Sequence, residues 1–301
     1  MAQPAQFSAP ERLAASLRSE GTPDAAAWLA GLPEALAQRL AQWRLVPERV
    51  VEPGGRSSVV VYAHRADDLA PVALKVARPS AEAAALRVWA GRGAVLLLDE
   101  ADGALLLERL HGEIPLRSLA EAKAMLESTS LLRRLWVPAP PGHPFEPLAD
   151  RAARAAARIA ERRALPAAGD AGPLVDEALE ALALAADGSG GEWLLHGDFR
   201  HGRVLAADRA PWLAVAPRPL VGDRAYDLAR LVLDRIDTLA ASPGPRGAAR
   251  RRLAQLAEAV ELPADRVRAW TLLRAVDAAL GAFAAGDPAA AELRLEFAAW
   301  L

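Results

Sequence analysis

The spacing of hydrophobic residues changes after about residue 112 of the chain. Before that point, short apolar runs alternate with polar turns that contain glycine, which is typical of an antiparallel sheet. The expected strands are residues 49–52, 59–62, 71–76, 94–98 and 104–108, with one helix at 81–90. Upstream, leucines recur at helical spacing and predict two short helices over 11–44, with a break at 21–23. The first third of the chain is therefore predicted to be a sheet with one inserted helix and a helical lead-in.

The rest of the chain carries mainly helical patterns. The expected helices are 115–135, 147–164, 174–185, 225–240, 246–260, 264–285 and 288–300, and the expected short strands are 203–206 and 212–215. A proline-rich loop is predicted at 138–147. These elements predict an α+β protein of two lobes, an N-terminal lobe over 1–110 and a helical C-terminal lobe over 111–301, with a cleft between them.

Composition narrows the choice of compartment and partner. The 301 residues are 52% hydrophobic, carry a formal net charge of −2 and include no cysteine. A nucleic-acid partner is not expected, because that would call for a basic excess. No apolar run approaches the roughly 20 residues of a membrane helix, and Met1–Pro10 has no basic start followed by an apolar run. We therefore expect a cytoplasmic protein without a membrane partner, whose oligomeric state the sequence does not indicate.

The segment 194–205 is the most informative part of the chain for chemistry. It reads LLHGDFRHGRVL, in which a His-Gly-Asp turn lies between two apolar runs. A carboxylate held there, Asp198, suits the acceptance of a proton from an attacking hydroxyl group in phosphoryl transfer. The plainer interpretation is an aspartate that caps a turn. We expect His196 to brace the loop backbone, whereas His201 is either a brace or a base.

Lys75 in the first lobe is the second candidate, because it interrupts an apolar strand. A strand lysine can hold nucleotide phosphates when a carboxylate positions it, and Glu82 on the next helix is the natural partner. The alternative is a solvated lysine on an edge strand. The turn that contains Gly54, Gly55 and Ser57 could approach phosphates through backbone N–H groups, although most such glycine pairs form plain turns.

Other polar residues allow weaker hypotheses. Asp223 and Asp227 open an expected helix, where Asp223 suits the N-cap position and both could bind back to the loop around Asp198. Asp277 in the helical lobe could hold a cationic acceptor, or it could simply be solvated. A zinc site is conceivable but poorly spaced; its ligands would be His111, His143, His196 and His201.

Several collinear segments resemble those of the aminoglycoside/hydroxyurea antibiotic-resistance kinases, in particular streptomycin 6-kinase-like proteins. The similar segments include 73–76, 86–95, 106–110, 133–140, 193–198, 211–215, 221–229 and 266–271. The resemblance implies a protein-kinase-like fold that binds ATP in the interlobe cleft and a small hydroxylated acceptor on the helical lobe. It also implies roles for four parts of the chain: Lys75 on the ATP phosphates, Glu82 as its partner, Glu108 to Leu110 as the adenine hinge and Asp198 as the catalytic base.

Two departures from the family pattern affect the metal. Arg203 stands where the family has a metal-binding asparagine, and Ala216 stands where it has a metal-binding aspartate. Mg²⁺ normally bridges the β- and γ-phosphates, and the loss of both expected ligands weighs against its use by this chain. Arg203, with Arg218 or Arg200, could neutralise phosphate directly, because guanidinium binds phosphate bidentately.

Two functions follow from these residues. The first is an ATP-dependent phosphotransferase that acts on a hydroxyl group of a small, aminoglycoside-like molecule in antibiotic resistance or secondary metabolism. The second is a catalytically impaired pseudokinase that binds a nucleotide or ligand and acts as a regulatory protein. The first is favoured by Lys75, Glu82 and Asp198, and the second by Arg203 and Ala216.

Overall fold

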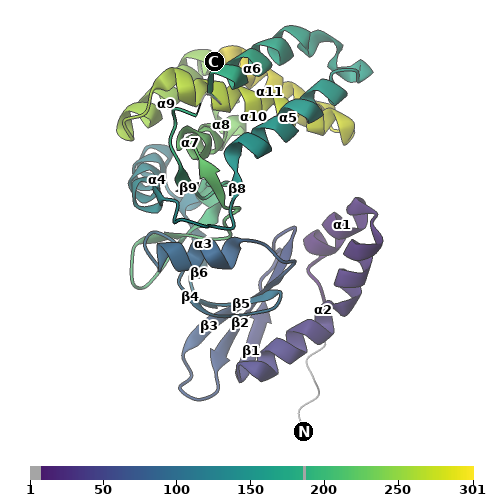
Figure 1. Ribbon diagram of the computed structural model, residues 1–301, viewed down its shortest axis with the longest axis vertical. Helices are drawn as coiled ribbons and strands as arrows, with labels where there is room; N and C mark the ends of the chain where they lie inside the picture. Colours follow the sequence, from purple (N-terminus) through teal and green to yellow (C-terminus); the bar gives the residue numbers. More distant parts are fainter. Residues whose placement is uncertain (1–7, 186–187) are drawn as a thin grey trace. The chain divides into compact units, whose positions relative to one another are not determined.

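The chain forms two compact units in the computed structural model, which describes residues 8–185 and 188–301 (Figure 1). Residues 1–7 lie outside this description; they belong to the segment Met1–Pro10, in which no leader sequence is expected. Unit 1 comprises the chain up to Gly112 together with Ala206–Pro211, and unit 2 comprises Glu113–Leu205 and Trp212–Leu301. The segment Ala206–Pro211 thus belongs to unit 1, although the sequence placed it in the helical lobe.

Unit 1 is built on a five-stranded sheet in the order β1-β2-β3-β5-β4. Its strands are β1 (Leu45–Val50), β2 (Ser58–Arg65), β3 (Pro71–Ala77), β4 (Leu97–Ala101) and β5 (Ala104–Glu108). Every neighbouring pair is antiparallel. The strand expected at 49–52 begins earlier, at Leu45, and the one expected at 94–98 begins later, at Leu97. The central position of β3 matters for function, because this strand carries Lys75.

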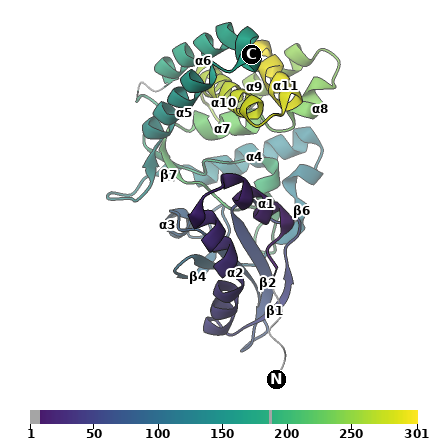
Figure 2. The ribbon, with the colours of Figure 1, turned by 90° about the vertical axis from the view of Figure 1, so that its right-hand side faces the viewer.

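Helices cover both faces of this sheet. On one face, α1 (Glu11–Glu20) and α2 (Pro23–Gln42) share a buried core with alternate residues of β2 and β3, among them Val61 and Leu74 (Figures 1 and 2). Successive side chains of a strand point to opposite faces, so Lys75 faces away from that core. Its face meets α3 (Glu82–Trp89), whose first residue is Glu82.

Unit 2 is organised around one long helix, α10 (Ala264–Ala284), which is buried along much of its length. The other helices of unit 2 are α4 (Glu121–Leu135), α5 (Leu148–Arg162), α6 (Gly172–Ala185), α7 (Ala225–Val232), α8 (Ile236–Ala240), α9 (Pro245–Ala259) and α11 (Pro288–Trp300). Short 3-10 turns lie at Leu116–Ser118, Pro166–Ala171 and His201–Arg203. The single helix expected at 225–240 is wrong, because the chain breaks at Arg235, where φ is 55°. Within the described ranges, no helix is both long and apolar enough to cross a membrane.

Short strands occur along the chain from His111 onward. One sheet has the order β7-β9-β12-β8, and another has the order β11-β10-β6. Their bounds are β6 (His111–Pro115), β7 (Val137–Pro138), β8 (Glu146–Pro147), β9 (Trp193–Leu195), β10 (Val204–Ala206), β11 (Trp212–Ala214) and β12 (Leu220–Gly222). The region 138–147, expected to be only a loop, thus includes strand residues at both ends. Strand β9 leads directly into the loop that carries Asp198.

Candidate active site

Lys75 and Glu82 form a buried ion pair in unit 1. Lys75 is 6% exposed and Glu82 is 5% exposed. Since β3 is a central strand, the interpretation of Lys75 as a solvated edge lysine is wrong. The ion pair joins Nζ to Oε2, while Oε1 of Glu82 is buried without a hydrogen-bond partner among the described residues.

The glycine turn that follows β1 is shaped by a positive φ. Gly54 has φ of 69°, and a Cβ at this position would meet Pro10 at 3.1 Å. Gly55 and Ser57 lie exposed in the same turn. The turn therefore needs glycine for its conformation, and its contact with phosphates stays a prediction.

The predicted adenine hinge has side-chain and backbone contacts of its own. The Glu108 carboxylate accepts hydrogen bonds from Arg209 at 2.7–3.0 Å and from the Leu96 amide at 2.6 Å. The carbonyl oxygen of Leu110 accepts from the Tyr62 hydroxyl at 3.3 Å and from the Gly112 amide at 3.1 Å. Arg209 thereby ties the segment Ala206–Pro211 to unit 1, and the hinge role stays a prediction.

The loop after β9 is fixed by a close backbone approach at Gly197. Its φ is 77°, and a Cβ there would lie 1.9 Å from the carbonyl oxygen of Arg218. The Arg218 amide also donates to the carbonyl of His196 at 2.8 Å. No side chain larger than glycine fits without displacing this backbone, so the His-Gly-Asp turn has one geometry.

Asp227 anchors the same loop from the first turn of α7. Its carboxylate accepts hydrogen bonds from the amides of His196 at 2.8 Å and Gly197 at 2.7 Å, and from Trp136 Nε1 at 3.3 Å. Burial raises the pKa of Asp227 to about 6, although these donors oppose the rise. Asp227 therefore binds back to the loop around Asp198, one of the two roles that the sequence suggested for it.

Arginines surround the Asp198 carboxylate. Arg203 Nη2 lies 2.9 Å from Oδ2, Arg230 Nε lies 3.1 Å from Oδ1, and Arg200 Nε lies 3.9 Å from Oδ1. Burial alone would raise the pKa of Asp198, but the three guanidinium groups outweigh it and leave the pKa below its ordinary value. Asp198 is thus an ionised carboxylate that is largely buried among cations.

Both histidines of the loop are bound in place. His196 Nε2 lies 3.1 Å from the Val215 carbonyl, and its Nδ1 accepts from the Asp198 amide at 3.3 Å. Burial lowers the pKa of His196 to about 3, so it is neutral and acts as a brace. His201 is buried and lies 2.8 Å from Asp234, whose pKa falls to about 2 because His201 outweighs the effect of burial. His201 is therefore also a brace rather than an open base.

The residues present do not fit a magnesium ion at the family's metal positions. Ala216 has no side-chain oxygen, and its backbone carbonyl accepts from Arg203 Nη1 at 2.7 Å. Arg203 thus joins the two positions at which ligands would be expected, with its other terminal nitrogen on Asp198. In residues 8–185 and 188–301, no three His, Asp or Glu side chains gather as a metal site.

Three more predicted residues have structural contacts in unit 2. The N-cap of α7 is Arg224, so the N-cap position expected for Asp223 is wrong by one residue. Asp223 accepts from the Ala225 amide at 2.9 Å, and its other oxygen binds Arg266 and Trp270 rather than the Asp198 loop. Arg218 is exposed. Asp277, for which the sequence left open either a cationic acceptor or plain solvation, is paired with Arg158 at 2.7 Å and Arg162 at 3.7 Å. These arginines compensate its negative charge, and a role in holding an acceptor stays a prediction.

Sequence reasoning missed Arg230, although a signal was present. Asp227, Arg230 and Asp234 are spaced by three and four residues in an otherwise apolar segment, which is the spacing of one side of a helix, and Asp234 follows α7 directly after its last turn. That side faces the loop, since Asp227 binds His196, Arg230 binds Asp198 and Asp234 binds His201. The spacing could have identified these three as a group.

Comparisons with known proteins agree on one family. The profile of the aminoglycoside/hydroxyurea antibiotic resistance kinases matches residues 42–286. The chain is 38% identical to streptomycin 6-kinase of Streptomyces griseus over 278 residues, 88% of this chain and 87% of the relative. It is 37% identical to hydroxyurea phosphotransferase of Kitasatospora aureofaciens, over 87% of this chain and 76% of the relative.

Solved structures agree on the fold. The choline kinase LicA of Streptococcus pneumoniae superposes with a TM-score of 0.61 at 11% identity, over 90% of this chain and 99% of that chain. At this identity the likeness concerns the fold alone. The fold is protein-kinase-like and α+β, as the sequence predicted.

Proposed function

Because the chain belongs to the aminoglycoside/hydroxyurea antibiotic resistance kinase family, we propose that it transfers the γ-phosphoryl group of ATP to a hydroxyl group of a small molecule. Relatives named streptomycin 6-kinase and hydroxyurea phosphotransferase support this class of reaction. The observation that carries the proposal for this chain is the buried pair of Lys75 and Glu82.

The burial of that pair favours a binding role over a stabilising one. Moving two charges out of water costs several kcal/mol per ion, so a buried pair is weak evidence for stability. A strand lysine held by a helix glutamate is the arrangement that kinases use to position nucleotide phosphates. Lys75 therefore binds the ATP phosphates, and Glu82 holds its ammonium group in place.

Asp198 accepts the proton in the transfer step. The acceptor oxygen attacks the γ-phosphorus, a new P–O bond forms, and the bond between the γ-phosphorus and the β–γ bridging oxygen breaks, releasing ADP. The hydroxyl proton passes to the Asp198 carboxylate. His196 and Asp227 keep that carboxylate in position by fixing the backbone on which it stands.

Arg203 takes the place of the absent metal ligands. A guanidinium group can bind phosphate bidentately and remains charged at neutral pH. Arg203 and Arg230 already lie on the two oxygens of Asp198, so positive charge is concentrated where phosphoryl transfer develops negative charge. We therefore propose that these arginines neutralise the transferring group and that magnesium bound by protein side chains is not required.

The test combines nucleotide binding with transfer. Purified protein is titrated with ATP by calorimetry and then incubated with [γ-³²P]ATP and a panel of hydroxylated acceptors that includes streptomycin and hydroxyurea. Asp198→Asn should keep ATP binding and lower transfer by roughly 10²–10⁴-fold, the usual contribution of a general base. Asp176→Asn is the matched control, because Asp176 is also paired with an arginine in unit 2 but is exposed.

Two outcomes would contradict the proposal. Failure to bind ATP would exclude an ATP-dependent kinase. Tight ATP binding with transfer to no acceptor and no slow hydrolysis would favour the pseudokinase, in which the arginines on Asp198 keep the carboxylate from accepting a proton.

A further inference from the structure

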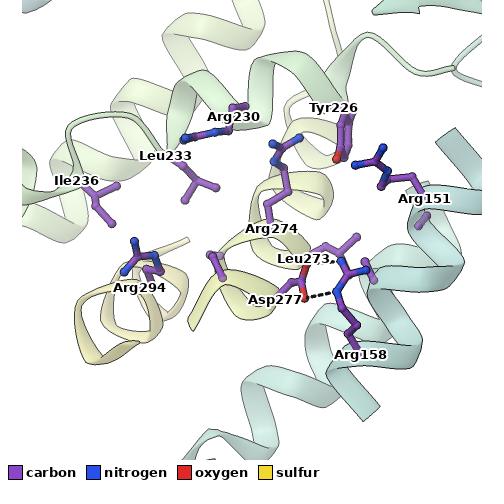
Figure 3. Close-up of a pocket in the computed structure, with 14 residues that line it drawn as sticks. Arg151, Arg158, Tyr226, Arg230, Leu233, Ile236, Leu273, Arg274, Asp277 and Arg294 are labelled. Atoms are coloured by element: carbon purple, nitrogen blue, oxygen red, sulfur yellow. Dashed lines mark hydrogen bonds and ion pairs between the residues drawn. The ribbon is translucent and has the colours of Figure 1, made fainter. Parts of the chain in front are cut away.

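Unit 2 contains a pocket that is lined by an unusual number of arginines (Figure 3). Its volume of about 380 Å³ lies within the range of small-molecule sites. Side chains from α5, α7, α10 and α11 converge on it, and Asp277 is its only acidic lining residue among those described. The arginines that line it are Arg151, Arg158, Arg230, Arg274 and Arg294.

Three of these arginines already share carboxylates. Arg151 binds Glu146 at 2.6 and 3.0 Å, and Arg158 binds Asp277 at 2.7 and 3.3 Å. Arg230 binds Asp198, which it shares with Arg203. Glu146 and Asp277 are shared in the same way, each with a second arginine, so the carboxylates around the pocket are outnumbered by cations.

Arg274 has no such carboxylate partner among the described residues. Its guanidinium carbon lies 4.2 Å from the centre of the Tyr226 ring, and Figure 3 shows its side chain between Arg230 and Tyr226. Its Nη1 atom is buried and makes no hydrogen bond within the described chain. Burial of the cation also lowers the pKa of Arg274. A buried donor without an acceptor is costly, and a bound anion would remove this cost.

Arg294 adds a further cation from α11 on another side of the pocket (Figure 3). Its described hydrogen bond goes to the carbonyl of Ala290, one turn earlier in its own helix. Apolar side chains complete the lining, including Leu233, Ile236 and Leu273. The pocket thus offers cations for a negative group and an apolar wall for the rest of a small molecule.

We propose that this pocket binds the negatively charged group, a carboxylate or a phosphate ester, of a small hydroxylated acceptor. The proposal rests on the proposed phosphotransferase function, to which Arg230 connects it by lining the pocket and contacting Asp198. Arg274 and Arg294 hold the anion, and the acceptor hydroxyl reaches Asp198. A polycationic acceptor is disfavoured, because it would bring like charges together.

The experiment measures binding without nucleotide, using four sugars that share one ring skeleton. Glucuronate and glucose 6-phosphate carry an anion, glucose is neutral, and glucosamine is a cation. Calorimetry should detect binding of one or both anionic sugars, with an affinity that falls as the salt concentration is raised. It should detect no binding of glucose or glucosamine. The two anionic arms distinguish a carboxylate site from a phosphate site.

Variants at Arg274 test the location of the site. Arg274→Gln should weaken binding of the anionic sugar by about tenfold or more, the loss expected for a hydrogen bond to a charged group. Arg268→Gln is the control, because Arg268 lies on the same helix but pairs with Glu177 outside the pocket. If Arg274→Gln has a much lower Tm than the wild type, Arg294→Gln supplies the same test from a different helix.

The outcomes separate this proposal from the proposed function. Binding of streptomycin or glucosamine in preference to both anionic sugars, or equal binding by Arg274→Gln and the wild type, would overturn the anionic pocket while leaving phosphotransfer intact. Binding of an anionic sugar without phosphoryl transfer to any acceptor would keep the pocket and overturn the enzymatic role.

Discussion

The ion pair of Lys75 and Glu82 in unit 1 and the cluster around Asp198 in unit 2 differ in how their charges are matched. In unit 1 one buried cation faces one buried anion. In unit 2 one carboxylate has three guanidinium groups within 4 Å. The first centre is balanced within itself, whereas the second has an excess of positive charge.

This difference indicates that an anionic ligand is expected to compensate excess charge near Asp198 rather than near Lys75. An excess of buried cations is costly unless an anion compensates it. Under the proposed function, the transferring phosphoryl group supplies such an anion around Asp198, and Arg203 is proposed to neutralise it in place of a metal ion. The pair of Lys75 and Glu82 needs no such compensation, and its proposed role is to hold the lysine in place for ATP.

Removing one member of the balanced pair should have the largest effect on stability. Lys75→Met leaves Glu82 as a buried carboxylate without its cation, which should lower the free energy of unfolding by about 3–5 kcal/mol. Chemical denaturation measures this loss. ATP binding should be lost at the same time, as calorimetry can show at a temperature where the variant is folded.

The double variant Lys75→Met/Glu82→Leu separates the two roles. It should recover most of the stability, because no unpaired charge remains, but it should not recover ATP binding. Restored ATP binding in the double variant would show that Lys75 does not hold the phosphates.

Displacing the loop that carries Asp198 should lower the free energy of unfolding by less than the loss of Lys75 does. Gly197→Ala places a Cβ against the Arg218 carbonyl and also strains φ, so we expect a loss of about 2–3 kcal/mol of stability, with strongly reduced transfer. Gly286→Ala is the matched control, because Gly286 has φ of 73° with open space around it. It should cost only about 1 kcal/mol, the strain of the left-handed conformation. Equal losses in the two variants would mean that the close approach at Gly197 is unimportant.

The effect that is smallest at neutral pH is the titration of His196. The pKa of His196 is about 3 in the folded protein and 6.5 as a model value, so only the unfolded chain takes up this proton between those limits. The contribution to stability is present above pH 6.5 and is lost as pH falls toward 3, by up to about 1.4 kcal/mol per pH unit. His196→Gln, whose amide can replace the Nε2 donor, should show a shallower decline over this window. Asp227, with a pKa of about 6, acts in the opposite sense, because its contribution is lost as pH rises through 6. An unchanged slope in His196→Gln would contradict the burial of a neutral His196.

The sequence predicted those parts of the molecule that depend on local pattern. Strong alternation of apolar runs and turns identified β2, β3 and β5, and helical spacing identified α1 and α2 on either side of the break at 21–23. The position of Asp198 after an apolar run was also correct, because β9 ends immediately before the loop. Strands such as β7, β8 and β12 are two or three residues long, too short to show a period.

Side-chain contacts between helices that are far apart in the chain could not be predicted from the sequence. Asp277 looked like an available carboxylate, but its neutralisation by Arg158 depends on how α5 packs on α10. The arginine pocket likewise arises only when α5, α7, α10 and α11 come together. The sequence identified Arg203 at a metal position, whereas only the structure shows the hydrogen bond that Arg203 donates to the Ala216 carbonyl.

The most direct test of the central claim is the affinity for a non-hydrolysable ATP analogue in EDTA and in Mg²⁺, measured by calorimetry. If arginines replace the metal ligands, the wild-type Kd should change by no more than about twofold between the two conditions, well under the factor of ten that 1.4 kcal/mol represents. The double variant Arg203→Asn/Ala216→Asp restores the family's ligands and should bind at least about tenfold more tightly with Mg²⁺. A wild-type protein that binds the analogue only in Mg²⁺ would contradict the claim.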